Sequence, residues 1–158
     1  MLKLIPGAVR GAVFIKDPTD NRLALRASIP IQNPPVSRTL ILKAVTDQKG
    51  FIWCGSNQQQ NDISMSMAQI GLRTGMYAPL VWQDESIGVL FVDNPKKQKA
   101  FTDNDLQFLV SVSQYVAAAV ANKLLNHEIE TNNRTLQNLL FNFSPQIRSR
   151  LLEKSREG

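Results

Sequence analysis

Cysteine and histidine are almost missing from this 158-residue sequence, which holds one residue of each, Cys54 and His127. A single cysteine cannot form an internal disulfide, so nothing in the chain points to secretion. The same shortage excludes a zinc site built from four cysteine and histidine ligands. A Ser-His-Asp triad needs a histidine held beside a nucleophile, and His127 falls in a long polar C-terminal stretch. We therefore expect no metal site and no catalytic residues.

Long apolar runs are also absent. No run approaches the roughly 20 residues that span a bilayer, and the N-terminal segment is too short for a signal peptide. These features predict a cytoplasmic protein without membrane insertion.

The positive charge is not organised for nucleic acid. The net charge is +5, but Lys and Arg are scattered, and aromatic residues are not interleaved with them as a groove for single strands requires. The pattern favours a solvated surface and no nucleic-acid partner.

Hydrophobic patterning predicts one α+β domain followed by a long helix. Alternation and short apolar runs bounded by turn residues are typical of strands, here over residues 11–16, 23–29, 51–54, 76–82 and 87–92. Turns at 17–21 and 83–86 join two pairs of them as hairpins. Pro79 cannot donate to a ladder and should face an edge or a bulge.

Capping residues predict where the helices begin. Ser37 stands at the start of a helix over 38–48, which Gly50 should end. Thr102 and Asp105 resemble a capping box at the start of a helix that runs from 103 to 143. A short helix over 64–71 completes the set.

A 3.5-residue repeat runs along the last helix beyond the apolar face that should cover the sheet. Such a repeat is typical of a parallel coiled coil, and little of the folded domain remains after Leu125 to cover it. Asparagines on the seam, Asn122 and Asn132, would fix register at a cost in stability. We expect a homodimer through a seam made of Phe108, Ser111, Tyr115, Ala118, Asn122, Leu125, Ile129, Asn132, Leu136, Leu139 and Phe143.

Three segments together resemble the GAF domain family, and the resemblance covers residue 3 to about residue 125. They are Ala78-Pro79-Leu80-Val81, Ile87 to Asp93, and Phe101 to Leu109, similar to the family's proline-leucine strand, isoleucine-glycine-valine-leucine strand and last-helix start. The resemblance implies an antiparallel central sheet flanked by helices. Members of the family usually begin with a long helix before the first strand. Here only residues 2–6 could be the end of that helix, so either this sequence begins within it or the helix is missing.

The tail carries a second resemblance. Residues 139–147, which contain a phenylalanine-serine-proline step, are similar to the segment before the catalytic domain of bacterial class III adenylate and guanylate cyclases. This implies a cyclase as the output domain. The two metal-binding aspartates of such enzymes have no counterpart in the 158 residues, so we expect no catalysis by this fragment.

The resemblance also implies ligand chemistries to weigh. GAF-type reductases of free methionine sulfoxide need several cysteines, and bilin-binding members hold the chromophore through one; Cys54 is interpreted instead as a buried apolar residue. Cyclic-nucleotide-binding members share a dispersed pattern that Asn94, Phe101 and Asp105 match. Pro95 stands where that pattern has lysine, and Leu106 where it has glutamate. The cofactor is therefore unknown, with a cyclic nucleotide as one alternative.

A ligand pocket is predicted between the sheet and residues 55–71. Its expected lining is Trp53, Ile63, Met67, Met76, Ala78 and Phe91, although methionine and aromatic side chains also simply fill cores.

These observations predict a GAF-like sensory domain over residues 1–125 and a signalling helix or linker over 126–158. The expected function is a non-catalytic regulatory domain that dimerises and passes a signal to a C-terminal nucleotidyl cyclase or another output domain. One alternative is a dimerisation or spacer module without a ligand. A second is a cyclic-nucleotide-binding domain. A third is a stand-alone GAF-type enzyme, which the single cysteine and single histidine disfavour. A fourth is the effector domain of a transcription factor, which would need a helix-turn-helix that these 158 residues do not show.

Overall fold

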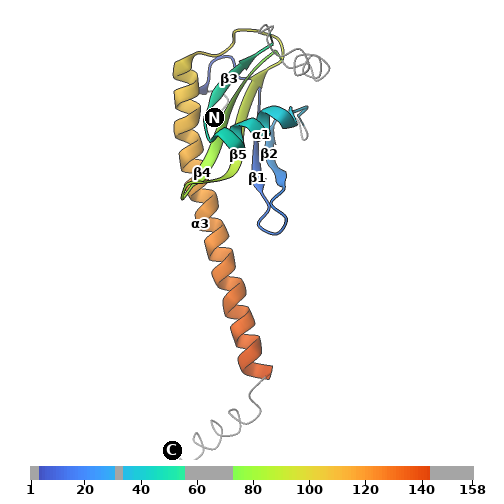
Figure 1. Ribbon diagram of the computed structural model, residues 1–158, viewed down its shortest axis with the longest axis vertical. Helices are drawn as coiled ribbons and strands as arrows, with labels where there is room; N and C mark the ends of the chain where they lie inside the picture. The colour runs from blue at the N-terminus through green and yellow to red at the C-terminus, as the bar shows by residue number, and fades with distance from the viewer. Residues whose placement is uncertain (1–3, 31–33, 56–72, 143–158) are drawn as a thin grey trace, which may run out of the picture. The chain divides into compact units, whose positions relative to one another are not determined.

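The computed structural model describes residues 4–30, 34–55 and 73–142 (Figure 1). The chain divides into two compact units, residues 1–119 and residues 120–158. The predicted short helix over 64–71, the Ser144-Pro145 step and Phe143 lie outside the described residues.

The first unit is built on one antiparallel sheet, as the sequence predicted. Its order is β2-β1-β5-β4-β3, and every neighbouring pair is antiparallel. Three of the four pairings join consecutive strands, and two of these, β1 with β2 and β4 with β5, are hairpins closed by short turns. The strands are β1 Arg10–Lys16, β2 Leu23–Ile29, β3 Phe51–Cys54, β4 Thr74–Trp82 and β5 Glu85–Asn94.

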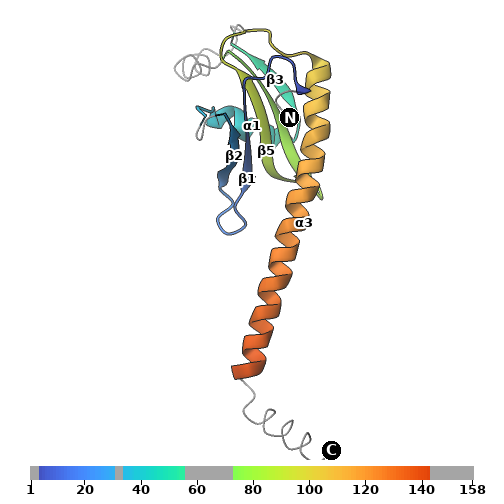
Figure 2. The same cartoon turned by 180° about the vertical axis from the view of Figure 1, so that it is seen from behind.

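The two faces of the sheet carry separate cores, because successive side chains along a strand point to opposite faces. Helix α1 (Arg38–Asp47) covers one face, and the first turns of α3 (Asp103–Asn142) cover the other (Figures 1 and 2). The buried core on the α1 face consists of Ala12, Phe14, Leu40, Ile41, Ala44, Tyr77, Val89 and Phe91. That on the α3 face consists of Ile5, Met76, Ala78, Leu80, Leu90, Val92, Phe101, Leu109 and Ala117.

The β4–β5 hairpin closes with a tighter turn than the predicted one over 83–86. The strands extend to Trp82 and Glu85, and the two residues between them have positive φ, 49° at Gln83 and 63° at Asp84. Two residues in this conformation match the right-handed twist of the flanking strands. The pairing of β3 with β4 ends at Tyr77, so β4 is an edge strand on that side at Pro79. This position suits proline, which has no backbone N–H to donate to a neighbouring strand.

Helix α1 begins as predicted and ends differently. The Ser37 hydroxyl accepts a hydrogen bond from Leu40 N at 3.3 Å, which confirms the cap. The left-handed position after the last turn is taken by Gln48, with φ of 51°, and not by Gly50. Gly50 is required for packing instead, since a Cβ there would lie 2.6 Å from Val110 Cγ2.

The capping box at the start of α3 is confirmed. Thr102 N donates to Asp105 Oδ2 at 2.8 Å, and Asp105 N donates to Thr102 Oγ1 at 3.3 Å. Among the described residues, one stretch, Asp103–Leu139 of α3, is long and apolar enough by composition to cross a membrane. Only 22% of the apolar window is buried, and a single helix that passes by length and composition says little about a membrane. The stretch is therefore weak evidence for membrane insertion.

Candidate functional site

Aromatic rings form a continuous row across four strands on the α1 face of the sheet. Phe51 stacks on Tyr77 with ring centroids 5.2 Å apart, and Tyr77 stacks on Phe91 at 5.7 Å. Phe14 continues the row at 6.3 Å from Phe91. Paired aromatic rings add stabilisation beyond the area they bury, so this row stabilises the packing of four strands on the α1 face.

A buried ion pair joins β1 to β5 on the same face. Arg10 Nε donates to Asp93 Oδ1 at 2.8 Å, and Arg10 Nη2 donates to Asp93 Oδ2 at 2.5 Å. The side chain of Asp93 has no exposed surface, and that of Arg10 is 9% exposed. Burial raises the pKa of Asp93, while the hydrogen bonds and charge of Arg10 act in the opposite direction. The pair links the N-terminal strand to the centre of the sheet.

The Tyr77 hydroxyl lies close to this pair. Tyr77 has no exposed surface, and within the described part of the chain its hydroxyl has no hydrogen-bond partner. Burial and the charge of Asp93 raise the pKa of Tyr77 above its ordinary value. Gly75 leaves room beside the ring, since a Cβ there would lie 3.2 Å from Tyr77. The phenol therefore holds its proton more tightly than an exposed tyrosine does, and among the described residues its O–H donor has no acceptor.

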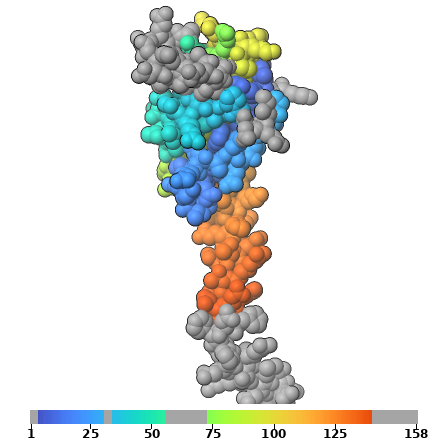
Figure 3. All heavy atoms as spheres, turned by 90° about the vertical axis from the view of Figure 1, so that its right-hand side faces the viewer, coloured from blue at the N-terminus to red at the C-terminus, as the bar shows by residue number. Residues whose placement is uncertain are grey.

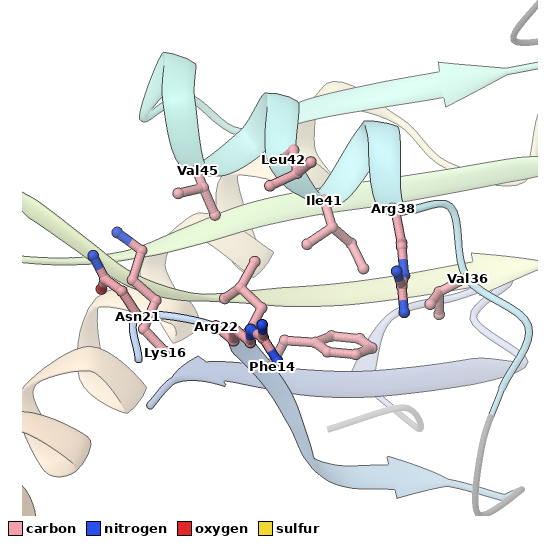
Figure 4. A pocket seen from close by; sticks show the side chains of 10 residues that line it. Phe14, Lys16, Asn21, Arg22, Val36, Arg38, Ile41, Leu42 and Val45 are labelled. Atoms are coloured by element: carbon pink, nitrogen blue, oxygen red, sulfur yellow. The ribbon is translucent and has the colours of Figure 1, made fainter. Parts of the chain in front are cut away.

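A cavity of about 660 Å³ opens on the α1 face between α1 and the β1–β2 hairpin. Figure 3 shows α1 beside the hairpin, and Figure 4 shows Ile41 and Val45 projecting from α1 toward Phe14. Its lining consists of Phe14, Lys16, Asn21, Arg22, Leu23, Val36, Arg38, Ile41, Leu42 and Val45.

The charged groups of this cavity all carry one sign. Lys16 ends β1, Arg22 directly precedes β2, and Arg38 begins α1, whereas no carboxylate of the described residues contributes to the lining. Arg22 has an acidic neighbour in Asp20, at 3.6 Å. Sequence reasoning treated these cations as ordinary solvated surface, because nothing in their spacing shows that the hairpin and helix bring them together.

The sheet separates the residues predicted to line a ligand pocket. Trp53 and Phe91 belong to the α1 face, whereas Met76 and Ala78 are buried on the α3 face. These four therefore do not line one space, because odd-numbered and even-numbered residues of these strands point to opposite faces. Ile63 and Met67 lie outside the described residues.

The three residues that match the cyclic-nucleotide pattern have structural contacts here. The Asn94 side chain donates to Gly7 O at 2.6 Å and accepts from the backbone of Lys96 and Lys97 at 2.8 and 3.0 Å. Phe101 is buried in the α3-side core, and the Asp105 carboxylate belongs to the capping box. Each side chain thus shapes the segment between β5 and α3.

Cys54 was expected to be a buried residue, but it is only partly buried. Its Sγ lies 3.5 Å from Thr74 Oγ1 in the adjacent strand. No group of three or more His, Cys, Asp or Glu that could hold a metal occurs among the described residues.

An exposed apolar seam runs along the described part of α3 in the second unit. Leu125, Ile129, Leu136 and Leu139 are 46–57% exposed. In the first unit, Phe108 and Tyr115 of the same predicted seam are 39% and 81% exposed. Large apolar side chains repeated in this way mark a surface that is unfavourable in water.

The fold defines a class of α+β domains in which an antiparallel sheet carries helices on both faces. Within that class the chain belongs to the GAF domain family, whose model matches residues 1–122. No curated protein gives a significant match.

Solved structures share this fold at low sequence identity. The GAF domain of a two-component sensor histidine kinase from Bacillus halodurans is 19% identical, with a TM-score of 0.63 over 80% of this chain and 90% of that one. A methyl-accepting chemotaxis protein is 20% identical, with a TM-score of 0.60 over 73% and 79%. A type II free methionine-R-sulfoxide reductase from Thermoplasma acidophilum is 19% identical, with a TM-score of 0.57 over 76% and 84%.

Proposed function

We propose that this chain is a non-catalytic, cytoplasmic sensory domain that dimerises through α3 and passes a signal to an output domain. The family supports the sensory role, since GAF domains occur in a sensor histidine kinase and similar folds in a chemotaxis protein. The proposed output is a nucleotidyl cyclase or another signalling domain, on the resemblance of residues 139–147. Signalling then requires that the two arrangements of the helix pair differ in affinity for the ligand.

The exposed apolar seam of α3 is the observation that supports the dimer proposal. An isolated helix gains little stability from its own hydrogen bonds and depends on packing of an apolar face. Leu125, Ile129 and Leu136 are 49%, 57% and 57% exposed, and they follow one another at spacings of four and seven. Pairing with the same seam of a second copy would bury these side chains together.

Light scattering after size exclusion tests the dimer. The expected mass is twice the 17.7 kDa of the chain. An Ile129→Glu variant should shift the equilibrium to monomer, because a carboxylate in a coiled-coil core loses its hydration without a partner. Thr131→Glu adds the same charge away from the seam and should remain dimeric. A monomeric parent chain at high micromolar concentration would end the proposal.

The output domain needs a separate experiment. The full product of the gene should be assayed for ATP and GTP cyclisation beside residues 1–158 alone. We expect activity in the full product and none in residues 1–158. If the full product shows a different signalling activity, the output domain is of that class and the cyclase assignment is wrong.

A further inference from the structure

We propose that the cavity between α1 and the β1–β2 hairpin binds a small organic anion, a carboxylate or phosphate carried on an apolar body. The inference rests on the proposed sensory function and supplies its ligand class. The described lining of the cavity shares no residue with the set predicted from sequence, and it comes from residues 14–23 and 36–45 of the first unit.

The floor of the cavity suits the apolar part of such a ligand. Phe14 and Ile41 are buried core residues, and Leu23, Val36 and Val45 are partly buried beside them. The Phe14 ring also contacts the Phe91 ring in a tilted arrangement, with centroids 6.3 Å apart. A ligand ring or chain placed against these side chains would leave water, which is favourable in proportion to the apolar area removed.

The pattern of ion pairing singles out the cations of the cavity. On the hairpin, Arg26 lies outside the cavity and is paired with Asp17 at 3.6 Å. On α1, Lys43 lies outside it and is paired with Asp47 at 2.8 Å.

By contrast, neither Lys16 nor Arg38, both in the cavity lining, has an ion pair within the described ranges. Arg22 adds a third cation whose acidic neighbour, Asp20, is at 3.6 Å. Charges of one sign around a low-dielectric floor concentrate the field and attract an ion of the other sign. The arrangement therefore favours an anion over a neutral or cationic molecule.

The dimensions indicate a small molecule. A volume of about 660 Å³ lies inside the range of roughly 300–1,000 Å³ that is typical of small-molecule sites. Arg38 suits planar, two-point binding of a carboxylate or phosphate, whereas Lys16 acts as a point charge. Either headgroup satisfies this chemistry, and the test separates the two.

Isothermal titration of the 158-residue chain with three matched probes tests the proposal. The probes are 1-naphthoate, 1-naphthyl phosphate and neutral 1-naphthamide, which share one apolar body. We expect at least one of the two anions to bind, at least tenfold more tightly than the amide and more weakly as salt is added. A preference between the anions identifies the headgroup.

Two double variants with equal loss of charge locate the site. Lys16→Gln with Arg38→Gln should weaken anion binding by roughly tenfold, given about two- to fivefold for each partly exposed charge. Arg26→Gln with Lys43→Gln removes two cations from the same elements outside the cavity and should change affinity by less than about twofold. Circular dichroism of both variants checks that they fold.

Three results would overturn the inference. They are absence of binding by both anions, equal binding of the amide, and equal losses in the two double variants, which would indicate attraction by net charge alone. Light scattering on the same samples tests the dimer independently of ligand binding. A dimer that binds no anion would leave the proposed dimeric sensory domain standing without this ligand class.

Discussion

Arg10 and Asp93 face each other across β1 and β5, 83 residues apart in the chain, and are joined by two hydrogen bonds in the interior. Removing both members of such a buried pair can be nearly neutral, whereas removing one leaves the other as an uncompensated charge. The structure therefore predicts strong coupling between these two positions.

A double-mutant cycle measures this coupling. Asp93→Leu alone should lower the free energy of unfolding by about 3–5 kcal/mol, because the guanidinium of Arg10 is left buried without a partner. Arg10→Met with Asp93→Leu should recover most of that loss, as read by urea unfolding. If the double variant loses as much as the sum of the single variants, the two side chains are independent and the prediction is wrong.

We expect Tyr77 to lower the free energy of unfolding at alkaline pH. The hydroxyl is buried and its pKa is raised above the ordinary value of 10.0, so the native state holds the proton more tightly than the unfolded state. The free energy of unfolding that this raised pKa contributes is complete below pH 10.0. Above that pH it is lost by about 1.4 kcal/mol for each pH unit, until the native phenol ionises.

Tyr77→Phe isolates this effect. Relative to the variant, the parent chain should lose unfolding free energy above pH 10 and not between pH 7 and pH 9. At neutral pH the variant should be about as stable as the parent, because the hydroxyl has no partner within the described residues. A variant that follows the same alkaline slope as its parent would show that Tyr77 does not cause it.

The centre of the sheet leaves no space for a side chain at Gly88. A Cβ at this position would lie 2.2 Å from the backbone oxygen of Phe14, so β1 and β5 would have to move apart. Gly88→Ala should cost at least about 1–3 kcal/mol in thermal or urea unfolding, the range of overpacked cores.

Gly55→Ala is the matched control for that substitution. The nearest atom to a Cβ at Gly55 is 3.3 Å away, at the edge of the Trp53 ring, which can shift. Its effect should be much smaller. Equal losses in the two variants would indicate a general cost of replacing glycine and would contradict the steric explanation.

Local chemistry in the sequence was enough to predict the elements. Alternation predicted β2, the Ser37 and Thr102 caps predicted where the two helices begin, and the repeat along α3 predicted the spacing of side chains that are exposed in the structure. Such signals act within a few residues, through backbone periodicity and hydrogen bonds to adjacent groups. The end of α1 was predicted wrongly because Gln48 adopted a conformation that favours glycine.

Contacts between distant segments were decided only by the tertiary structure. Pairing of β1 with β5 placed Arg10 against Asp93 and buried Tyr77 beside them. Packing of α1 over the hairpin brought Lys16 and Arg38 to one cavity. Strand parity put Phe91 and Met76 on opposite faces, although both lie in apolar runs. The sequence by itself determined local periodicity and caps, whereas strand order and register decided which side chains meet, because those depend on burying both faces of one sheet at once.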